Sequence, residues 1–516
     1  MLPVELQAIA AGLPILVILV LMLGLRWSAA RAGIAGLVAA LLIAWFGFGF
    51  GTDILPQIGP AGATGGALAE AVFIALTILW IIFPALCIHE LQLRTGSVEV
   101  LEQSISRVAE APALTALLVA WFFGLFIEGA AGFGTSAALA APFLVSLGFK
   151  PVQAVTLALI GHAVGVSFGA VGTPVLPQME MTGFTGRELA SATAAYHGMV
   201  GWIMPCIIVL MVRRALPARE RIGPAVWLWA LAAAALFLLP MLLVAFAVGP
   251  ELPTLGSALF GGVLFTVLLM HASRREVLGI AATGVEPVDV VATTRAAAPY
   301  LVLVTAVLLT RLLPPVRRTL QELTVEWEYA GVFEGSMAVL YHPGSMILLG
   351  FALGAWFQGA VHAQVRDSAL AALRRLGPVT VALVAMLVLS RVMVHAEMIE
   401  TLAVATAGLA GGAWPLLAPL VGVLGTFVTG SATTSNILFT EFQVATAQRL
   451  DMPVLPLLGA QGFGAAVGNI ICPHNIVAAS ATVDLTGSEG EVLRRTLLPV
   501  IIYALMGGAL ALFVFT

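Results

Sequence analysis

The sequence predicts an all-α polytopic membrane protein, with about twelve transmembrane helices and two re-entrant helical hairpins. Its 516 residues are 60% hydrophobic and only 10% charged, with a mean hydropathy of +1.05, whereas about a quarter of the residues in soluble domains are charged. Apolar runs recur along the whole chain. Two further apolar regions, 111–148 and 413–449, are interrupted by clusters of small residues. A large soluble core is excluded, because its helices would need polar faces and these have none.

Transmembrane helices are expected wherever a run of roughly 17 to 25 mostly apolar residues occurs. Their expected bounds are 8–25, 33–50, 69–88, 150–176, 189–212, 224–248, 252–271, 296–314, 344–361, 378–396, 453–480 and 496–515. The first run is not expected to be a cleaved signal, because a second run follows at once and no basic region precedes it. Two amphipathic stretches, 94–110 and 364–377, are expected to lie along the membrane interface.

The basic residues favour hairpins that do not cross the membrane. With the N-terminus outside, the inside loops hold most of them, namely Arg26, Arg31, Arg94, Arg107, Lys150, Arg213, Arg214, Arg219, Arg221, Arg274, Arg275, Arg295, Arg366, Arg374, Arg375, Arg494 and Arg495. The outside loops hold only Arg187, Arg317, Arg318 and Arg449. This asymmetry follows the positive-inside rule, so both termini are expected to be periplasmic. The acidic loop 321–334 is then external.

An internal repeat relates the two halves of the chain. Residues 128–131 align with 429–432, and in each half a short apolar helix, a proline and a long glycine-broken segment follow. The chain is expected to divide into a first repeat at 1–215, with hairpin 111–148 and broken helix 150–176; two linking helices and a cytoplasmic loop at 216–295; and a second repeat at 296–516, with hairpin 413–449 and broken helix 453–480. An odd number of crossings separates the copies, so the repeats are expected to be inverted, as in secondary transporters.

The hairpin tips are the expected binding site. Lipid cannot satisfy the free backbone groups of a tip, so such groups are tolerated where they line a wet cavity. The helix that leaves each tip points its positive N-terminal end at that cavity, which favours an anion. The alternative is that the small residues only allow close helix packing. The expected substrate-binding residues are Gly129, Ala130, Gly132, Gly134, Thr135, Ser431, Thr433, Thr434, Ser435, Asn436, Asn469, His474 and Arg391.

Two titratable residues are candidates for proton coupling. Glu128 directly precedes the glycines of the first tip, and burial of a carboxylate favours its protonated form. Its alternatives are a capping role at the next helix or a permanent pair with an arginine. His162 is either a proton relay or a helix-packing histidine. Arg391 either binds a substrate carboxylate or pairs with Glu128, and Arg311, nearer a helix end, is expected to snorkel.

Several classes of function are excluded or disfavoured. The cysteines Cys87, Cys206 and Cys472 have unrelated spacings, so neither a disulfide framework nor a metal site is expected. The net charge of −4 gives no reason to expect nucleic acid. The chain carries no HExxH, P-loop or GxSxG pattern. We therefore expect neither an enzyme nor a cofactor, and the partners are a small carboxylate substrate and membrane lipid.

Six motifs resemble the L-lactate permease family of bacteria: EGAAGFGTSAALAAP (128–142), GPELP (249–253), PYLVLVTAVLLTR (299–311), GSATTSN (430–436), GNIICPHNIVAA (468–479) and EGEVLRRTL (489–497). The resemblance covers nearly the whole chain and implies proton-coupled uptake of lactate, glycolate and similar 2-hydroxymonocarboxylates across the bacterial inner membrane. Thr135-Ser136 and His474 depart from the family pattern and add polar groups near the tips.

More distantly, the paired hairpins resemble the superfamily of divalent-anion and sodium symporters. That resemblance implies a homodimer with a fixed scaffold and mobile elevator domains. Sodium coupling is the alternative to proton coupling. An anion channel and an intramembrane enzyme are alternatives from other classes; accumulation against a gradient would exclude the channel.

Overall fold

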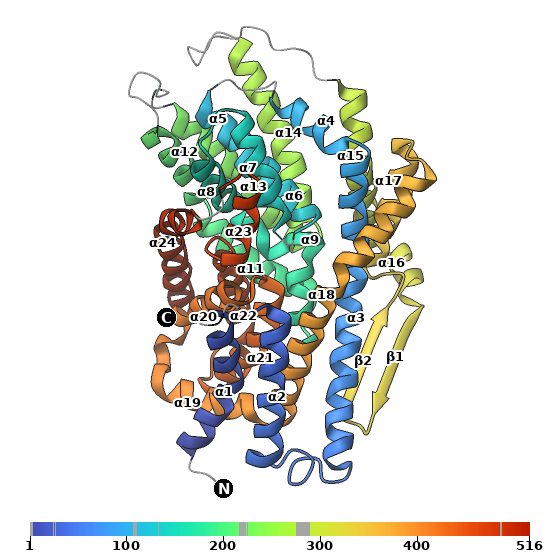
Figure 1. Ribbon diagram of the computed structural model, residues 1–516, viewed down its shortest axis with the longest axis vertical. Helices are drawn as coiled ribbons and strands as arrows, with labels where there is room; N and C mark the ends of the chain where they lie inside the picture. Colours follow the sequence, from blue (N-terminus) through green and yellow to red (C-terminus); the bar gives the residue numbers. More distant parts are fainter. Residues whose placement is uncertain are drawn as a thin grey trace.

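The computed structural model describes residues 4–23, 25, 27–106, 111–132, 134–215, 223, 225–274, 289–485 and 488–515. The protein is predominantly helical (Figure 1). Within these residues, nine helices are long and apolar enough to cross a membrane, or up to twelve if each bent pair is one span. The expected class of polytopic helical membrane protein is therefore confirmed. The expected inside residues Arg26, Arg107, Arg219, Arg221 and Arg275 lie outside the described residues.

One group of helices packs around two long ones. Its members are α1 (Val4–Leu23), α2 (Ala29–Gly47), α3 (Gly59–Arg94), α4 (Ser97–Ser106), α15 (Val290–Leu312), α17 (Pro343–Gln358) and α18 (His362–His395). The helix α18 packs against both α3 and α2, and α17 packs against α3 and α15. We refer to this group as the α3–α18 group.

Both long helices exceed their expected bounds. The helix α3 has 36 residues, because its apolar sequence continues on either side of the expected 69–88. The stretch 364–377 is not a separate interfacial arm, since α18 runs through it and bends by 41° where Gly377 precedes Pro378. The side chain of Gln364 donates to the carbonyl oxygen of Arg94 at 3.0 Å, which joins the start of α18 to the end of α3.

Two helical hairpins are present where the sequence predicts them. Hairpin 1 consists of α5 (Pro112–Ala116), the π-helix η1 (Leu117–Phe123), α6 (Gly124–Ala130) and α7 (Thr135–Ser146). Hairpin 2 consists of α20 (Trp414–Thr429) and α21 (Ala432–Arg449), preceded by α19 (Met398–Ala410) and η5 (Gly411–Ala413). In Figure 1, α5 lies near the upper end of the molecule and α19 near the lower end. Only α7 has the expected half-membrane length; the first arm of hairpin 1 spans 19 residues and is almost wholly buried.

Both predicted broken helices are broken. The first is divided into α8 (Pro151–Gly161), η2 (Ala163–Phe168), α9 (Gly169–Gly172), η3 (Thr173–Val175) and α10 (Leu176–Thr182), and so extends past the expected end at 176. The second is divided into α22 (Val454–Gly468) and α23 (Pro473–Ala481). The remaining helices are α11 (Gly186–Val200), α12 (Ile203–Ala215), α13 (Val226–Ala247), α14 (Pro253–Arg274), α16 (Pro314–Gln321) and α24 (Glu489–Phe515).

The two hairpins are braced by corresponding hydrogen bonds. Near the start of α7, the Ser136 hydroxyl donates to the carbonyl oxygen of Gly124 at 2.7 Å. Near the start of α21, the Ser435 hydroxyl donates to the carbonyl oxygen of Gly422 at 2.9 Å. Each bond ties the second arm of a hairpin to its first arm, so a serine near the start of the second arm braces both hairpins.

Glycines also pack the broken helices onto the hairpins in corresponding ways. A Cβ atom on Gly161 of α8 would overlap the carbonyl oxygen of Ala120 in hairpin 1. A Cβ atom on Gly464 of α22 would overlap the carbonyl oxygen of Pro419 in hairpin 2. Backbone therefore lies directly on backbone at both crossings, and no larger residue fits without a shift of the helices.

Gly464→Ala should destabilise the protein by about 1–3 kcal/mol, the usual cost of overpacking a dense interior. The measurement is thermal unfolding of the purified protein in detergent. Gly408→Ala on α19 is the matched control, because a Cβ atom there meets nothing within 4 Å, and alanine favours a helix. Equal melting temperatures for the two variants would contradict the close crossing of α20 and α22.

A small β-hairpin corrects the all-α prediction. Strands β1 (Thr324–Tyr329) and β2 (Phe333–Ala338) pair antiparallel within the acidic loop expected to be external. Alternation of side chains in TVEWEY is typical of a strand. The side chain of Phe333 is fully buried, packs against Gly66 of α3, and lies 4.6 Å from the His395 ring, centroid to centroid.

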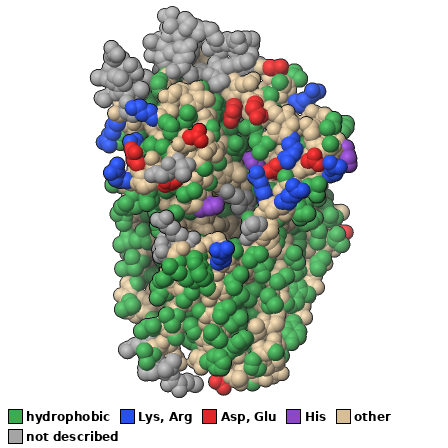
Figure 2. All heavy atoms as spheres, viewed as in Figure 1, with side chains coloured by type: hydrophobic (Ala, Val, Ile, Leu, Met, Phe, Trp, Pro, Cys, Tyr) green, Lys and Arg blue, Asp and Glu red, His purple; other side chains and the backbone are tan. Residues whose placement is uncertain are grey.

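The surface is divided between apolar and charged zones. Figure 2 shows charged side chains gathered toward one end of the visible face, with hydrophobic side chains covering most of the remainder. Large apolar side chains such as Phe46, Leu228 and Phe260 are more than half exposed. A soluble protein rarely exposes apolar area on this scale. The exposed apolar surface is therefore consistent with contact with membrane lipid.

Candidate functional site

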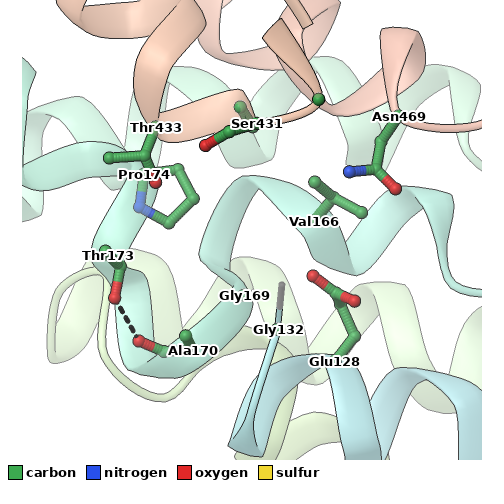
Figure 3. Close-up of a pocket in the computed structure, with 12 residues that line it drawn as sticks. Glu128, Gly132, Val166, Gly169, Ala170, Thr173, Pro174, Ser431, Thr433 and Asn469 are labelled. Atoms are coloured by element: carbon green, nitrogen blue, oxygen red, sulfur yellow. Dashed lines mark hydrogen bonds between the residues drawn. The ribbon is translucent and has the colours of Figure 1, made fainter. Parts of the chain in front are cut away.

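Both hairpin tips and both helix breaks line one cavity (Figure 3). The lining residues are Glu128 and Gly132 from hairpin 1; Val166, Gly169, Ala170, Thr173 and Pro174 from the first broken helix; Gly430, Ser431, Ala432 and Thr433 from hairpin 2; and Asn469 from the second broken helix. Segments about three hundred positions apart in the chain therefore meet at a single place, which the internal repeat predicts.

The backbone at the cavity is left-handed at several positions. Gly132 and Gly134 at the first tip have φ of 58° and 78°, and Gly430 at the second tip has φ of 80°, a region that glycine enters without strain. Ala170 and Val171 also have positive φ, of 43° and 57°. Such a conformation in residues with side chains costs of the order of 1–3 kcal/mol each and is concentrated at functional sites.

Two helix N-termini begin at the tips. The helix α7 starts at Thr135 after Gly134, and no side chain caps it. The helix α21 starts at Ala432, and its N-cap Ser431 accepts a hydrogen bond from the backbone N–H of Thr434 at 3.2 Å. Uncapped N–H groups and the helix dipole together favour an anion. The tips thus supply positive backbone ends beside the hydroxyl groups of hairpin 2.

Glu128 is the acidic member of the cavity lining. Its side chain is 5% exposed and points from α6 toward Val166 and Asn469 (Figure 3). Among the described residues, its Oε2 atom has no hydrogen-bond partner, and His162 Nε2 lies 4.0 Å from it. Its other oxygen lies against Gly169, where a Cβ atom would overlap it. Neither of the alternative roles, helix capping or pairing with an arginine, is found for this carboxylate in the part of the chain that the structure describes.

His162 is completely buried at the end of α8. Its Nδ1 atom lies 2.7 Å from the carbonyl oxygen of Ala158, and its Nε2 atom lies 3.1 Å from Oδ1 of Asn469. The same Oδ1 accepts a hydrogen bond from Nδ2 of Asn475 at 2.8 Å. The histidine is therefore connected to the second broken helix and not simply packed among apolar groups.

The structure separates the sequence-predicted residues into two sets. Glu128, Gly132, Ser431, Thr433 and Asn469 line the cavity. The other predicted residues lie outside this lining, namely Gly129, Ala130, Gly134, Thr135, Thr434, Ser435, Asn436, His474, Arg391 and His162.

Some residues outside the lining have clear packing roles. Gly129 faces the backbone of Leu255, where a Cβ atom would lie 2.7 Å from Cα. Ser435 braces hairpin 2, and the side chain of Asn436 donates to the carbonyl oxygen of Pro174 at 2.8 Å. Asn436 thereby fixes the tip of hairpin 2 against the first break. These residues do not line the cavity, but their contacts hold the segments that do.

Arg391 belongs to a buried ionic cluster away from the cavity. Its guanidinium contacts Glu441 of α21 at 2.9 Å and Glu70 of α3 at 3.4 Å, and Nε2 of His395 lies 2.7 Å from the second oxygen of Glu70. We call Arg391, Glu70, Glu441 and His395 the Arg391 cluster. It joins the α3–α18 group to hairpin 2, so the arginine is paired with carboxylates of the protein itself.

The snorkelling expected of Arg311 is wrong. Its side chain is 7% exposed, donates to Oε1 of Glu251 from two nitrogens, at 2.6 Å and 3.0 Å, and lies over the Tyr341 ring at 3.8 Å. Glu251 lies in the GPELP motif, sixty residues earlier in the chain. Because the two residues are so far apart in the sequence, the residues around Arg311 do not indicate that its side chain is buried and paired with a carboxylate.

Sequence reasoning also missed a buried polar chain next to the first break. The Ser167 hydroxyl lies 2.8 Å from His197 Nε2, and His197 Nδ1 lies 2.7 Å from the hydroxyl of Tyr503. The Ser167 hydroxyl also donates to the carbonyl oxygen of Gly462 at 3.1 Å. The Ser167 oxygen therefore accepts a hydrogen bond from Nε2–H of His197, and Nδ1 accepts one from the hydroxyl of Tyr503. This chain ties η2 to α11, α22 and α24.

The fold and the cavity define a polytopic membrane protein of the transport class, with binding groups at broken helices near its centre. The chain belongs to the L-lactate permease family, which matches residues 7–516. It is accordingly a permease and not an enzyme, which confirms that expectation.

Individual relatives agree with this family. The L-lactate permease of Streptococcus iniae is 30% identical, over 86% of this chain and 92% of that protein. The glycolate permease GlcA of Escherichia coli strain K12 is 27% identical, over 99% of this chain and 96% of that protein. A solved structure, the antimetabolite efflux pump MtrF of Neisseria gonorrhoeae, is similar with a TM-score of 0.52 and 14% identity, over 93% of this chain and 94% of that chain. At that identity the similarity concerns the fold alone.

Proposed function

We propose that the protein is a proton-coupled secondary transporter, which takes up L-lactate and related 2-hydroxymonocarboxylates such as glycolate across the bacterial inner membrane. The observation that carries the proposal is the cavity, which brings the buried carboxylate of Glu128 together with the hydroxyl groups of Ser431 and Thr433 and the N-terminus of α21. The names of the relatives, which include lactate and glycolate permeases, support this substrate class.

The physical basis of the coupling is charge. A substrate carboxylate beside an ionised Glu128 would repel it strongly, because both charges lie in a poorly screened interior. Protonation of Glu128 removes that repulsion, so proton and anion bind with positive cooperativity. The substrate carboxylate meets the N-termini of α7 and α21, and its 2-hydroxyl meets Ser431 or Thr433. The loaded site then carries one negative charge instead of two and crosses the membrane at lower cost.

The same proposal includes the movement of the site. The element order and the similar serine and glycine contacts of the two halves support an inverted repeat. The distribution of basic residues supports a periplasmic location of both termini. The α3–α18 group then forms a scaffold, and the hairpins with their broken helices form an elevator-type transport domain. A homodimer is part of the proposal, and its test is the mass of the detergent-solubilised protein measured by light scattering.

Uptake by proteoliposomes tests the function. Labelled L-lactate should accumulate when the pH gradient is imposed, equally with and without sodium, and unlabelled glycolate should compete while a dicarboxylate should not. Pyruvate as a competitor reports whether the 2-hydroxyl is required. Accumulation that needs sodium at a fixed proton gradient would replace proton coupling with the sodium alternative, and equilibration without accumulation would indicate a channel.

Thr433→Val should raise the KM for lactate about tenfold, since it removes one hydroxyl of the cavity at an ordinary hydrogen-bond cost of about 1–1.5 kcal/mol. Thr426→Val is the matched control, because Thr426 is fully buried in the neighbouring arm and is absent from the lining of the cavity. The measurement is the concentration dependence of initial uptake. An unchanged KM in Thr433→Val would remove this residue from the binding site.

A further inference from the structure

The hydrogen bonds around His162 depend on whether the ring carries one proton or two. The Nδ1 atom faces a backbone carbonyl, that of Ala158. A carbonyl only accepts, so Nδ1 carries a proton. The Nε2 atom faces Oδ1 of Asn469, another acceptor. A ring with one proton would leave two acceptors facing each other here, so the arrangement fits a ring with a proton on each nitrogen. The Nε2 atom lies 4.0 Å from Oε2 of Glu128.

Asn475 holds the Asn469 amide in this orientation. Its Nδ2 atom donates to the same Oδ1 of Asn469 at 2.8 Å. A neutral His162 would need a donor at Nε2, which Asn469 can supply only by turning its amide through half a rotation. That rotation would bring two NH₂ groups face to face and break the bond from Asn475. The hydrogen bond from Asn475 therefore favours the doubly protonated ring.

Asn475 also contacts the tip of hairpin 1. It lies at the start of α23, is 1% exposed, and its Oδ1 atom has no hydrogen-bond partner among the described residues. A Cβ atom on Gly134 would lie 2.8 Å from this oxygen. Gly134 is the residue from which α7 begins. The amide of Asn475 is thus in contact with Asn469 on one side and with the tip of hairpin 1 on the other.

Few titratable side chains belong to the elements that pack around His162. Among the described ion pairs, only Glu128 of α6 is partnered with it. Of the elements packed against α8, the helices α7, η1 and η2 carry no titratable side chain. The titratable side chains of the other elements packed against α8 are His474 of α23, Cys206, Arg213 and Arg214 of α12, and Glu489, Glu491, Arg494, Arg495 and Tyr503 of α24.

We infer that Asn475 is a positioning residue for proton coupling, which acts through the amide of Asn469 on His162 and links the proton on Nε2 to the tip of hairpin 1. The inference rests on the proposed function and deepens it. When His162 gains its second proton, both Nε2 and Asn475 donate to Oδ1 of Asn469, and the two amides keep their orientation. When that proton leaves, the amide of Asn469 can rotate, and its hydrogen bond with Asn475 breaks. The proton state is thereby transmitted from the first broken helix, through the second, to the start of α7.

The test is the pH dependence of lactate uptake by proteoliposomes containing Asn475→Ala. Without the Asn475 donor, Asn469 can turn toward a neutral His162, so the protonated form is less favoured. The pH midpoint of uptake should fall by about half to one unit, the effect of one hydrogen bond of ordinary strength. Asn475→Thr keeps a polar group that donates and accepts equally, and its midpoint should fall in the same direction by less.

Gln178→Ala is the matched control. Gln178 is a fully buried amide on α10, it donates to the carbonyl oxygen of Leu458, and its Oε1 atom is unpartnered within the described residues. Its loss should lower the amount of folded protein without moving the midpoint. An unchanged midpoint in both Asn475 variants, with wild-type uptake still driven by a pH gradient, would overturn the inference alone. If lactate uptake by the wild-type protein did not depend on the pH gradient, both the inference and the proposed function would be overturned.

Discussion

Glu128→Gln should abolish the accumulation of lactate that a pH gradient drives, while exchange of lactate across the membrane continues. Glutamine keeps the size and polarity of a protonated carboxyl group, so the cavity still accepts the anion. It cannot release a proton, so movement of the site is no longer tied to the gradient. With one proton per substrate, a gradient of one pH unit supports up to about tenfold accumulation in the wild type, and the variant should show none. Uptake and counterflow in the same proteoliposomes measure the two activities.

Glu180→Gln is the control for this experiment. Glu180 is an exposed carboxyl on α10, at the end of the same broken helix, and it does not line the cavity. Its replacement removes one acidic group without touching the site, so accumulation should persist. Full gradient-driven accumulation by Glu128→Gln would remove Glu128 from the mechanism.

Arg391→Met should destabilise the protein by about 3–5 kcal/mol, the usual cost of removing one partner from a buried ion pair. The side chain of Arg391 is 5% exposed, and those of Glu70 and Glu441 are 13% and 17% exposed. Both carboxylates would lose the guanidinium in a place that water hardly reaches, and among the described residues only Glu70 would keep a partner, His395. Thermal unfolding in detergent measures the effect, and Glu441→Gln in the Arg391→Met background should restore part of the loss.

Arg366→Met is the matched control for the Arg391 cluster. Arg366 also contacts a carboxylate, that of Asp367, but the two side chains are 62% and 47% exposed. An exposed pair contributes about 0–1 kcal/mol, because water screens it. Similar melting temperatures for the Arg366 and Arg391 variants would mean that the Arg391 cluster does not hold hairpin 2 to the α3–α18 group.

The hairpin tips and helix breaks were predictable, because glycine and proline are conspicuous in an apolar chain. Lipid penalises unpaired backbone groups so strongly that segments such as 128–136 and 468–475 have few structural interpretations. The internal repeat then placed both tips at one site. Five predicted residues of the cavity lining, Glu128 among them, follow from this reasoning alone.

The partners of buried polar side chains were not predictable. Arg391 and Glu70 are 321 residues apart, and His197 and Tyr503 are 306 residues apart. No periodicity relates such positions, since their contact depends on how whole helices pack. For the polar residues of the second tip, the sequence also does not show which side chains line the cavity and which pack inside the hairpin. Thr433 faces the cavity, whereas Ser435 turns toward Gly422, because side chains two positions apart on a helix point in nearly opposite directions.

The β-hairpin has a practical consequence through Phe333. Its ring covers His395 and thereby closes one side of the Arg391 cluster to solvent. Surface loops are often trimmed when proteins of this kind are prepared for crystallisation, and residues 324–338 are an obvious target. Trimming them here would hydrate the guanidinium and its carboxylates, weaken their attraction, and loosen the contact between the α3–α18 group and hairpin 2.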